Sequence, residues 1–149
     1  MQTIPDQNLE QKKRYLKSYR RNRSCLERLE EKLAELDARI YGLKSPMLSD
    51  MPKGGKGIDR EDLITDKLEL QERINRINRK GRKLKSEILD LIDELEDVRY
   101  IEVLEAFLVE CKSFSDIAED NCYTERHVIR LYSEAMRELL DICQYNVGK

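Results

Sequence analysis

The sequence predicts an all-α protein, in which a long antiparallel helical hairpin over residues 1–96 is followed by a small helix-turn-helix domain over residues 97–149. Apolar residues recur with heptad spacing in two long stretches, and a segment rich in proline and glycine separates them. Shorter amphipathic segments with capping residues end the chain. Charged residues make up 39% of the chain and aromatic residues 6%, so the apolar residues must form stripes, not a thick core.

The first long helix is expected over residues 8–43, because nothing in this stretch interrupts a helix. Two apolar rows with heptad spacing run along it and suit the core positions of a coiled-coil seam. One row consists of Tyr19, Leu26, Leu33 and Ile40, and the other of Leu29, Leu36 and Leu43. Charged residues fill most other positions, as on a solvated helix surface.

A flexible loop is expected over residues 44–58, inside a segment (42–62) with two prolines and four glycines. Proline ends helices, and glycine favours loop conformations. The GGKG sequence at 54–57 also suggests a phosphate cradle, but the full P-loop pattern is absent and no predicted strand precedes it. The flexible loop is therefore the favoured interpretation.

The second long helix is expected over residues 59–95, where the heptad pattern returns. Its rows are Leu63, Leu70, Ile77, Leu84, Leu91 and Val98, and Ile74, Gly81, Ile88 and Leu95. Folding the two helices as a hairpin would set Asn22 near Lys80 and Lys17 near Lys85. The heptads fit a coiled coil between two chains equally well, so a homodimer stays open.

Gly81 stands in one of these apolar rows, where glycine costs about 1 kcal/mol of helix propensity. We expect it to leave room for the ring of Tyr19, with Asn22 as a polar core position that fixes the register of the hairpin. A simple weak point in the seam is the alternative.

The hairpin would also bring two basic stretches side by side, since residues 12–23 and 73–85 each hold seven cations and no acid. Contact with a nucleic acid or another polyanion is one interpretation, and a solvated helix surface is the other. The residues predicted for polyanion contact are Lys17, Arg20, Arg21, Arg76, Arg79, Lys80, Arg82 and Lys83.

Three helices are expected within residues 97–149. The first ends near Cys111, Ser113 begins the second in the manner of a capping box, and Thr124 N-caps the third. In a helix-turn-helix the first turns of the recognition helix reach base edges in the major groove, and Arg126 and Arg130 have donors for guanine or phosphate. The predicted DNA-binding residues are Thr124, Glu125, Arg126, His127, Arg130, Ser133 and Arg137.

The segment SFSDIAEDNCYTERHVIRLYSEAMREL, residues 113–139, resembles the C-terminal promoter-reading helix-turn-helix of sigma factors. The matching residues are Phe114, Ile117, Ala118, Thr124, Glu125, Arg126 and Val128. Further upstream, YLKSYRRNRSCLERLEEKL followed by SPMLSDMPKGGKG is similar to a phage and prophage family of unknown function from Gram-positive bacteria, akin to ArpU- and RinA-type late transcriptional regulators. The resemblance implies a role in phage gene control.

Three positions depart from that resemblance. Relatives usually place Leu and then Gly or Asn where this chain has Asn121 and Cys122, and Gly is common where it has Cys111. We expect the missing leucine to loosen the turn before the recognition helix by a few kcal/mol, roughly, unless other groups fill the space.

The leading functional hypothesis is therefore a DNA-binding transcription regulator whose partner is double-stranded DNA and which needs no cofactor. The net charge of −2 divides unevenly, and residues 97–149 hold six basic against eleven acidic residues. Because this excess of acid repels phosphates, the basic hairpin would have to supply the attraction. The alternative is a non-enzymatic adaptor that docks on RNA polymerase or a phage protein through its coiled coil and acidic C-terminal domain.

Other classes of function find little support. His127 is the single histidine, and no catalytic constellation surrounds it in the sequence, so we do not expect an enzyme. Four cysteines without a CxxC pair predict reduced thiols, and a zinc site of Cys111, Cys122, His127 and Cys143 has no familiar ligand spacing. The chain shows neither a membrane-length apolar run nor a signal-peptide core, so we expect no membrane contact and place the protein in the cytoplasm of the bacterial host.

Overall fold

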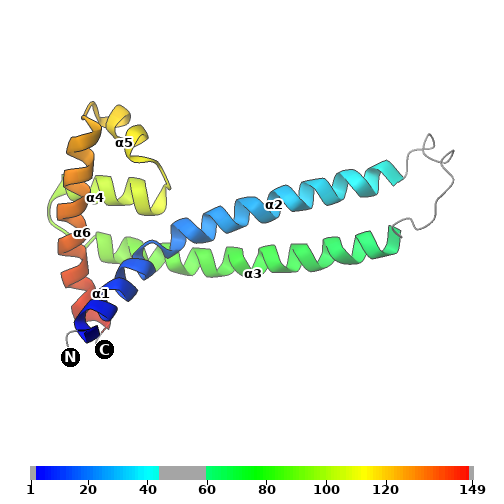
Figure 1. The fold of residues 1–149 in the computed structure, drawn as a ribbon, viewed down its shortest axis with the longest axis horizontal. Coiled ribbons are helices and arrows are strands. Elements are labelled where there is room, and N and C mark those ends of the chain that lie inside the picture. Colours follow the sequence, from blue (N-terminus) through cyan, green and yellow to red (C-terminus); the bar gives the residue numbers. More distant parts are fainter. Residues whose placement is uncertain (1–2, 44–59, 148–149) are drawn as a thin grey trace. The chain divides into compact units, whose positions relative to one another are not determined.

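The computed structural model describes residues 3–43 and 60–147, with side chains over 8–42 and 60–143. Every regular element in these residues is helical, which confirms the predicted all-α class. The elements are α1 (Thr3–Leu16), α2 (Ser18–Leu43), α3 (Arg60–Ile92), α4 (Val98–Leu104), the π-helical turn η2 (Glu105–Val109), α5 (Phe114–Asn121) and α6 (Glu125–Val147) (Figure 1). None of these described helices has the length and apolarity needed to cross a membrane. The loop predicted at 44–58 lies outside the described residues.

The contacts between residues group the chain into two compact units. Unit 1 contains the described residues up to Arg23 and those from Gly81 onward, and unit 2 is Ser24–Lys80. The start of α2 and the end of α3 therefore belong to unit 1, together with the C-terminal helices. Unit 1 thus contains residues from both sides of the domain boundary that the sequence predicts at 96/97. Independent folding of residues 97–149 stays a prediction.

Unit 2 consists of the parts of α2 and α3 that run antiparallel, side by side (Figure 1). Leu26 and Leu29 of α2 are buried against Ile74 of α3, and partly buried apolar residues extend this core along the seam. Farther along, Lys67 Nζ lies 2.7 Å from Asp37 Oδ1. These pairs lie within one or two residues of the predicted hairpin register, so the heptad rows do face each other here.

The single helix predicted over 8–43 is wrong at Lys17, where the structure separates α1 from α2. The Ser18 hydroxyl donates a hydrogen bond to the Tyr15 carbonyl. A guanidinium nitrogen of Arg21 donates another to the Arg14 carbonyl over 2.7 Å. Both side chains compete with backbone N–H groups for carbonyls of the last turn of α1, which bends or interrupts a helix.

The larger core of unit 1 joins α1, α3, the α4–η2 segment and α6. Leu16, Ile88, Ile92, Leu104 and Leu139 are all fully buried in it. Burying each such side chain contributes about 1.5–3 kcal/mol, so α1 is fixed on α3 and α6 by apolar contact. This packing places the basic residues of α1 beside α6, the predicted recognition helix.

Gly81 does leave room for a side chain, but for a different one than predicted. A Cβ atom built on Gly81 would lie 2.4 Å from Asn22 Oδ1 and 3.1 Å from Asn22 Cγ, and its three nearest neighbours are all Asn22 atoms. The Tyr19 ring is instead buried in the larger core. Asn22 is shorter than tyrosine and stands opposite the glycine, so it takes the space that the missing Cβ leaves.

Candidate nucleic-acid interface

Each of the two helices that flank the turn into α6 begins with an N-cap. The Ser113 hydroxyl accepts a hydrogen bond from the Asp116 N–H over 3.1 Å, and the Thr124 hydroxyl accepts one from the His127 N–H over 3.1 Å. Both predicted N-caps are thus confirmed. Each satisfies a backbone donor that would otherwise be unpaired at a helix start, which contributes typically about 1 kcal/mol.

Cys122 ends α5 in the left-handed conformation, with φ 58° and ψ 37°. The next residue, Tyr123, donates its N–H to the Ala118 carbonyl over 2.9 Å, which is the Schellman arrangement of a helix end. Cys111 is the other non-glycine residue with positive φ in the described chain, at 63°. Glycine adopts this conformation more easily than other residues do, so Cys111 and Cys122 stand at positions where the backbone favours glycine.

The Asn121 side chain bonds back to its own helix. Its side chain is exposed at the end of α5, and Asn121 Nδ2 donates to the Ile117 carbonyl over 2.8 Å. The interior beside it is filled by Ile117 and Ala118, which pack with Val128 and other residues of α4 and α6. The expected loosening of the turn depends on unfilled space beside Asn121, and it stays a prediction.

Arg126 and Arg130 stand exposed on the first turns of α6, while Val128 and Leu131 on its other side are buried. Arg126 makes no ion pair within the described residues. Arg130 Nε lies 3.8 Å from Glu134 Oε2, and the Arg130 side chain is 71% exposed. Such a distant surface pair is worth little, so both guanidinium groups are available to a ligand.

The other residues predicted on these turns differ in accessibility. Glu125 is exposed and acidic, which suits the positive end of the helix but opposes a phosphate. His127 is half-buried, with its ring edge-on to Tyr123 at 4.8 Å between centroids. Thr124 is exposed, and its oxygen is already used by the cap. Arg126 and Arg130 are thus the best-placed donors of the set.

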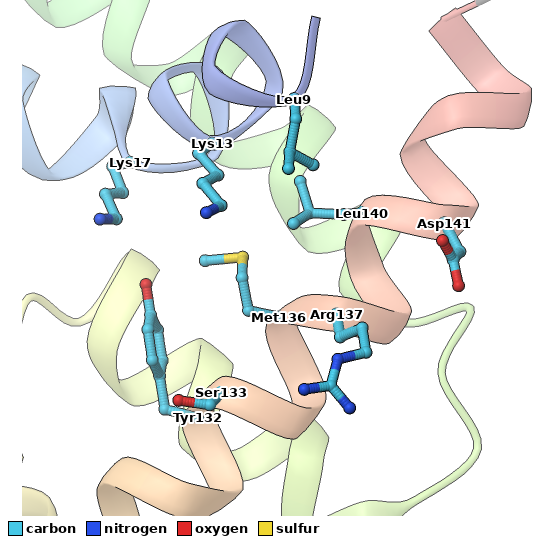
Figure 2. A pocket seen from close by; sticks show the side chains of 9 residues that line it. All are labelled: Leu9, Lys13, Lys17, Tyr132, Ser133, Met136, Arg137, Leu140 and Asp141. Atoms are coloured by element: carbon cyan, nitrogen blue, oxygen red, sulfur yellow. The ribbon is translucent and has the colours of Figure 1, made fainter. Parts of the chain in front are cut away.

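Ser133 and Arg137 lie farther along α6, where they border a pocket of about 400 Å³ together with Lys13 of α1 and Lys17, the residue between α1 and α2 (Figure 2). The axial rise from Arg126 to Arg137 is about 16 Å, which exceeds the width of a major groove. The seven residues predicted for DNA binding therefore divide into a group at the start of α6 and a group beside α1. Lys13 and Tyr132, which also line the pocket, were not predicted, although Lys13 lies within the basic stretch 12–23.

Most residues predicted for polyanion contact are exposed. Lys17, Arg21, Arg82 and Lys83 are exposed in unit 1, and Arg76, Arg79 and Lys80 in unit 2. Arg76 Nη1 lies 3.9 Å from Glu72 Oε1 one turn earlier. These seven predicted residues thus remain on the surface of their units, whereas Lys12 of the same basic stretch is buried.

Arg20 is the exception, because its guanidinium is used inside unit 1. Arg20 Nε donates to the Phe107 carbonyl over 2.8 Å, and Arg20 Nη2 donates to the Lys112 carbonyl over 3.1 Å. Its Cζ lies 3.9 Å from the centroid of the Phe107 ring. These carbonyls belong to η2 and to the loop before α5, so Arg20 ties α2 to the helices of the C-terminal region. The prediction of Arg20 as a polyanion contact is therefore corrected, because its guanidinium has a structural role.

An aromatic cluster lies directly under this arginine. Phe107 stacks on Phe114 at 4.6 Å between centroids, and Tyr132 meets both rings edge-on, at 4.9 and 5.2 Å. Burial raises the pKa of the Tyr132 phenol to about 12. The cluster joins η2, α5 and α6, so it fixes the orientation of the recognition helix.

The described residues contain no group of three or more His, Cys, Asp or Glu side chains placed to hold a metal ion. Cys122 is exposed in the turn, whereas Cys143 is buried in α6. Comparison of this chain with protein-family models, curated proteins and solved structures gives no match.

Proposed function

We propose that this protein is a phage-type DNA-binding transcription regulator whose α6 enters the major groove. The observation that carries the proposal is the exposure of Arg126 and Arg130 on the first turns of a capped, firmly packed helix. Arginine in this position pairs with the O6 and N7 atoms of guanine, and each such pair contributes about 1–3 kcal/mol of discrimination. The sequence resemblance supports the phage context.

Electrostatic attraction comes from the N-terminal residues of the same unit. Residues 97–149 carry an excess of acid, and Lys112 is held by Asp120 at 2.8 Å and Glu110 at 3.4 Å. The basic stretch 12–23 belongs to the same compact unit as α6. Its exposed cations, including Lys17 and Arg21, offset the repulsion between the acidic residues and DNA phosphates.

The division of α6 into two groups suggests how a duplex would lie. With Arg126 and Arg130 at base edges, Arg137, Lys13 and Lys17 would stand at the groove wall, where phosphates run. Recognition helices of other DNA-binding proteins use their N-terminal residues for bases and their later residues for the backbone. Bases would thus be read by two arginines, and register would be fixed by the others.

Selection of bound fragments tests this proposal. The full chain is incubated with fragmented phage and host DNA at low salt, and retained fragments are sequenced. We expect a common motif that contains guanine, lost with the double variant Arg126→Ala/Arg130→Ala and kept with Arg28→Ala, which removes an exposed arginine from unit 2. Failure to retain any fragment at low salt rejects the proposal.

A second candidate function is an adaptor that docks on RNA polymerase without DNA. The acidic excess of residues 97–149 favours it, with Asp116 and Glu119 exposed on α5. Co-purification with polymerase after nuclease treatment would support the adaptor, especially if Arg126→Ala/Arg130→Ala left the complex intact.

A further inference from the structure

The pocket between α1 and α6 has the features of an anion site. Its volume is about 400 Å³, and its lining combines cations with apolar side chains such as Met136. Figure 2 shows Lys13 of α1 and Lys17, which follows α1, reaching toward the Tyr132 hydroxyl and Met136. Two lysines and one tyrosine from distant parts of the chain thus line the same space.

Cations outnumber acids around this space. Asp141 contributes the carboxylate of the lining, and Figure 2 shows it directed away from the lysines, as is Arg137. The stretch 12–23 contains no acid, and Glu10, three residues before Lys13 on α1, is outside the lining of the pocket. An anion between the lysines would therefore meet attraction from both sides.

The Tyr132 hydroxyl supplies an independent indication of a ligand. It is buried and has no hydrogen-bond partner among the described residues. Leaving a buried hydroxyl unpaired is unfavourable, and native proteins seldom do so without a bound water or ligand. Its raised pKa, a consequence of burial, keeps the phenol protonated at neutral pH, so it can donate a hydrogen bond.

We propose that this pocket binds a phosphate group, held by Lys13 and Lys17 and by a hydrogen bond donated from the Tyr132 hydroxyl. A phosphate monoester suits the site better than carboxylate, because it carries a charge of about −1.5 to −2 and three strong acceptor oxygens. A backbone diester carries a single negative charge, which the two lysines also attract. The Tyr132 hydroxyl oxygen is itself covered, so side chains beside it must move before a phosphate oxygen reaches it. The phosphate belongs either to a nucleic-acid backbone or to a small phosphorylated molecule, and the inference does not depend on the proposed function.

The test titrates the full chain with inorganic phosphate at constant ionic strength and follows the phosphorus resonance. We expect saturable binding that weakens at least tenfold in Lys13→Gln/Lys17→Gln. Tyr132→Phe should weaken binding severalfold, while thermal unfolding shows that the aromatic cluster stays packed. Lys85→Gln, an exposed lysine of unit 1 outside the pocket, is the matched control and should bind as the unchanged chain does.

Absence of saturable binding, or equal binding by the pocket variants and the control, overturns the inference. A second arm uses a DNA duplex. If Lys13→Gln/Lys17→Gln lowers duplex affinity for all sequences alike and reduces the salt slope by about 1, as expected for one lost phosphate contact, the phosphate is that of the backbone. If the duplex is unaffected but inorganic phosphate binding is lost, the natural ligand is a small phosphorylated molecule.

Failure of this inference can be separated from failure of the proposed function. Phosphate binding that needs Lys13 and Lys17, in a chain that retains no DNA, leaves the pocket assigned and rejects the regulator. Duplex binding that needs Arg126 and Arg130 but ignores both lysines, in a chain without saturable phosphate binding, leaves the regulator and rejects the pocket.

Discussion

Adding one methyl group at Gly81 should test the contact between α2 and α3 in unit 1. Alanine favours the helix over glycine by about 1 kcal/mol, so Gly81→Ala would stabilise an unobstructed helix. Here the new Cβ would lie 2.4 Å from Asn22 Oδ1. Carbon and oxygen need more than 3 Å, so the Asn22 side chain or the helix must move by about 1 Å.

The size of the effect follows from two opposing contributions. Overpacking of this kind costs typically about 1–3 kcal/mol, against the gain in propensity of about 1 kcal/mol. We therefore expect Gly81→Ala to lower the free energy of unfolding by about 1 kcal/mol. In an Asn22→Ala background the obstacle is absent, and the same change should raise the free energy of unfolding by about 1 kcal/mol.

Urea unfolding measures both effects, with loss of helix followed by circular dichroism at about 222 nm. The four proteins compared are the unchanged chain, the two single variants and the double variant. The expected coupling between the two positions is about 2 kcal/mol. An equal effect of Gly81→Ala in both backgrounds would show that Asn22 does not stand opposite this glycine, and the register of the helices in unit 1 would have to be revised.

Three further predictions concern the helix-turn-helix segment. Cys122→Gly should raise the free energy of unfolding by about 1 kcal/mol, because φ is positive at this position, whereas Cys122→Val should lower it. A thermal melt in which the valine variant is more stable than the glycine variant would contradict this. Arg20→Ala should lower the free energy of unfolding by about 2–4 kcal/mol, because two charged hydrogen bonds and the contact with Phe107 are lost. The control Arg23→Ala should lower it by less than about 0.5 kcal/mol. Equal losses for the two variants in urea unfolding would refute the structural role of Arg20. Burial, with Asp93 and Glu110 nearby, raises the pKa of Glu105, so ionisation destabilises the fold above that pKa. Glu105→Gln should then have a higher free energy of unfolding than the unchanged chain at pH 7, and this difference should disappear below about pH 4. A difference that grows toward low pH would contradict the raised pKa of Glu105.

The sequence was a good guide wherever one periodicity decided the structure. The heptad rows of α2 and α3 predict which faces of these helices are buried, because an apolar stripe on a long helix must leave water. They fit pairing within one chain and between two chains equally well. The caps Ser113 and Thr124 are local features, so they were predictable from their neighbours alone. The arginines of α6 were expected outside for the same reason, as the opposite side of that helix is apolar.

Contacts between distant segments were not predictable in this way. The break at Lys17 depends on the hydrogen bonds of Ser18 and Arg21, which leave the apolar pattern unchanged. Arg20 is indistinguishable in sequence from its basic neighbours, and only the approach of Phe107 to α2 gives it a structural role. The unpaired hydroxyl of Tyr132 likewise follows from the packing of three helices. Sequence patterns give the face of a helix, whereas these roles need the distance to another element.

The central claim is that Arg126 and Arg130 read bases. Its most direct test is the ratio of dissociation constants for a selected duplex and a scrambled duplex of equal length, measured by mobility shift at fixed salt. Specific binding should exceed scrambled binding by roughly 1000-fold or more for the unchanged chain. For Arg126→Ala/Arg130→Ala the ratio should fall close to one while scrambled binding changes little. An undiminished ratio in the double variant would contradict the claim, because some other surface would then be reading the sequence.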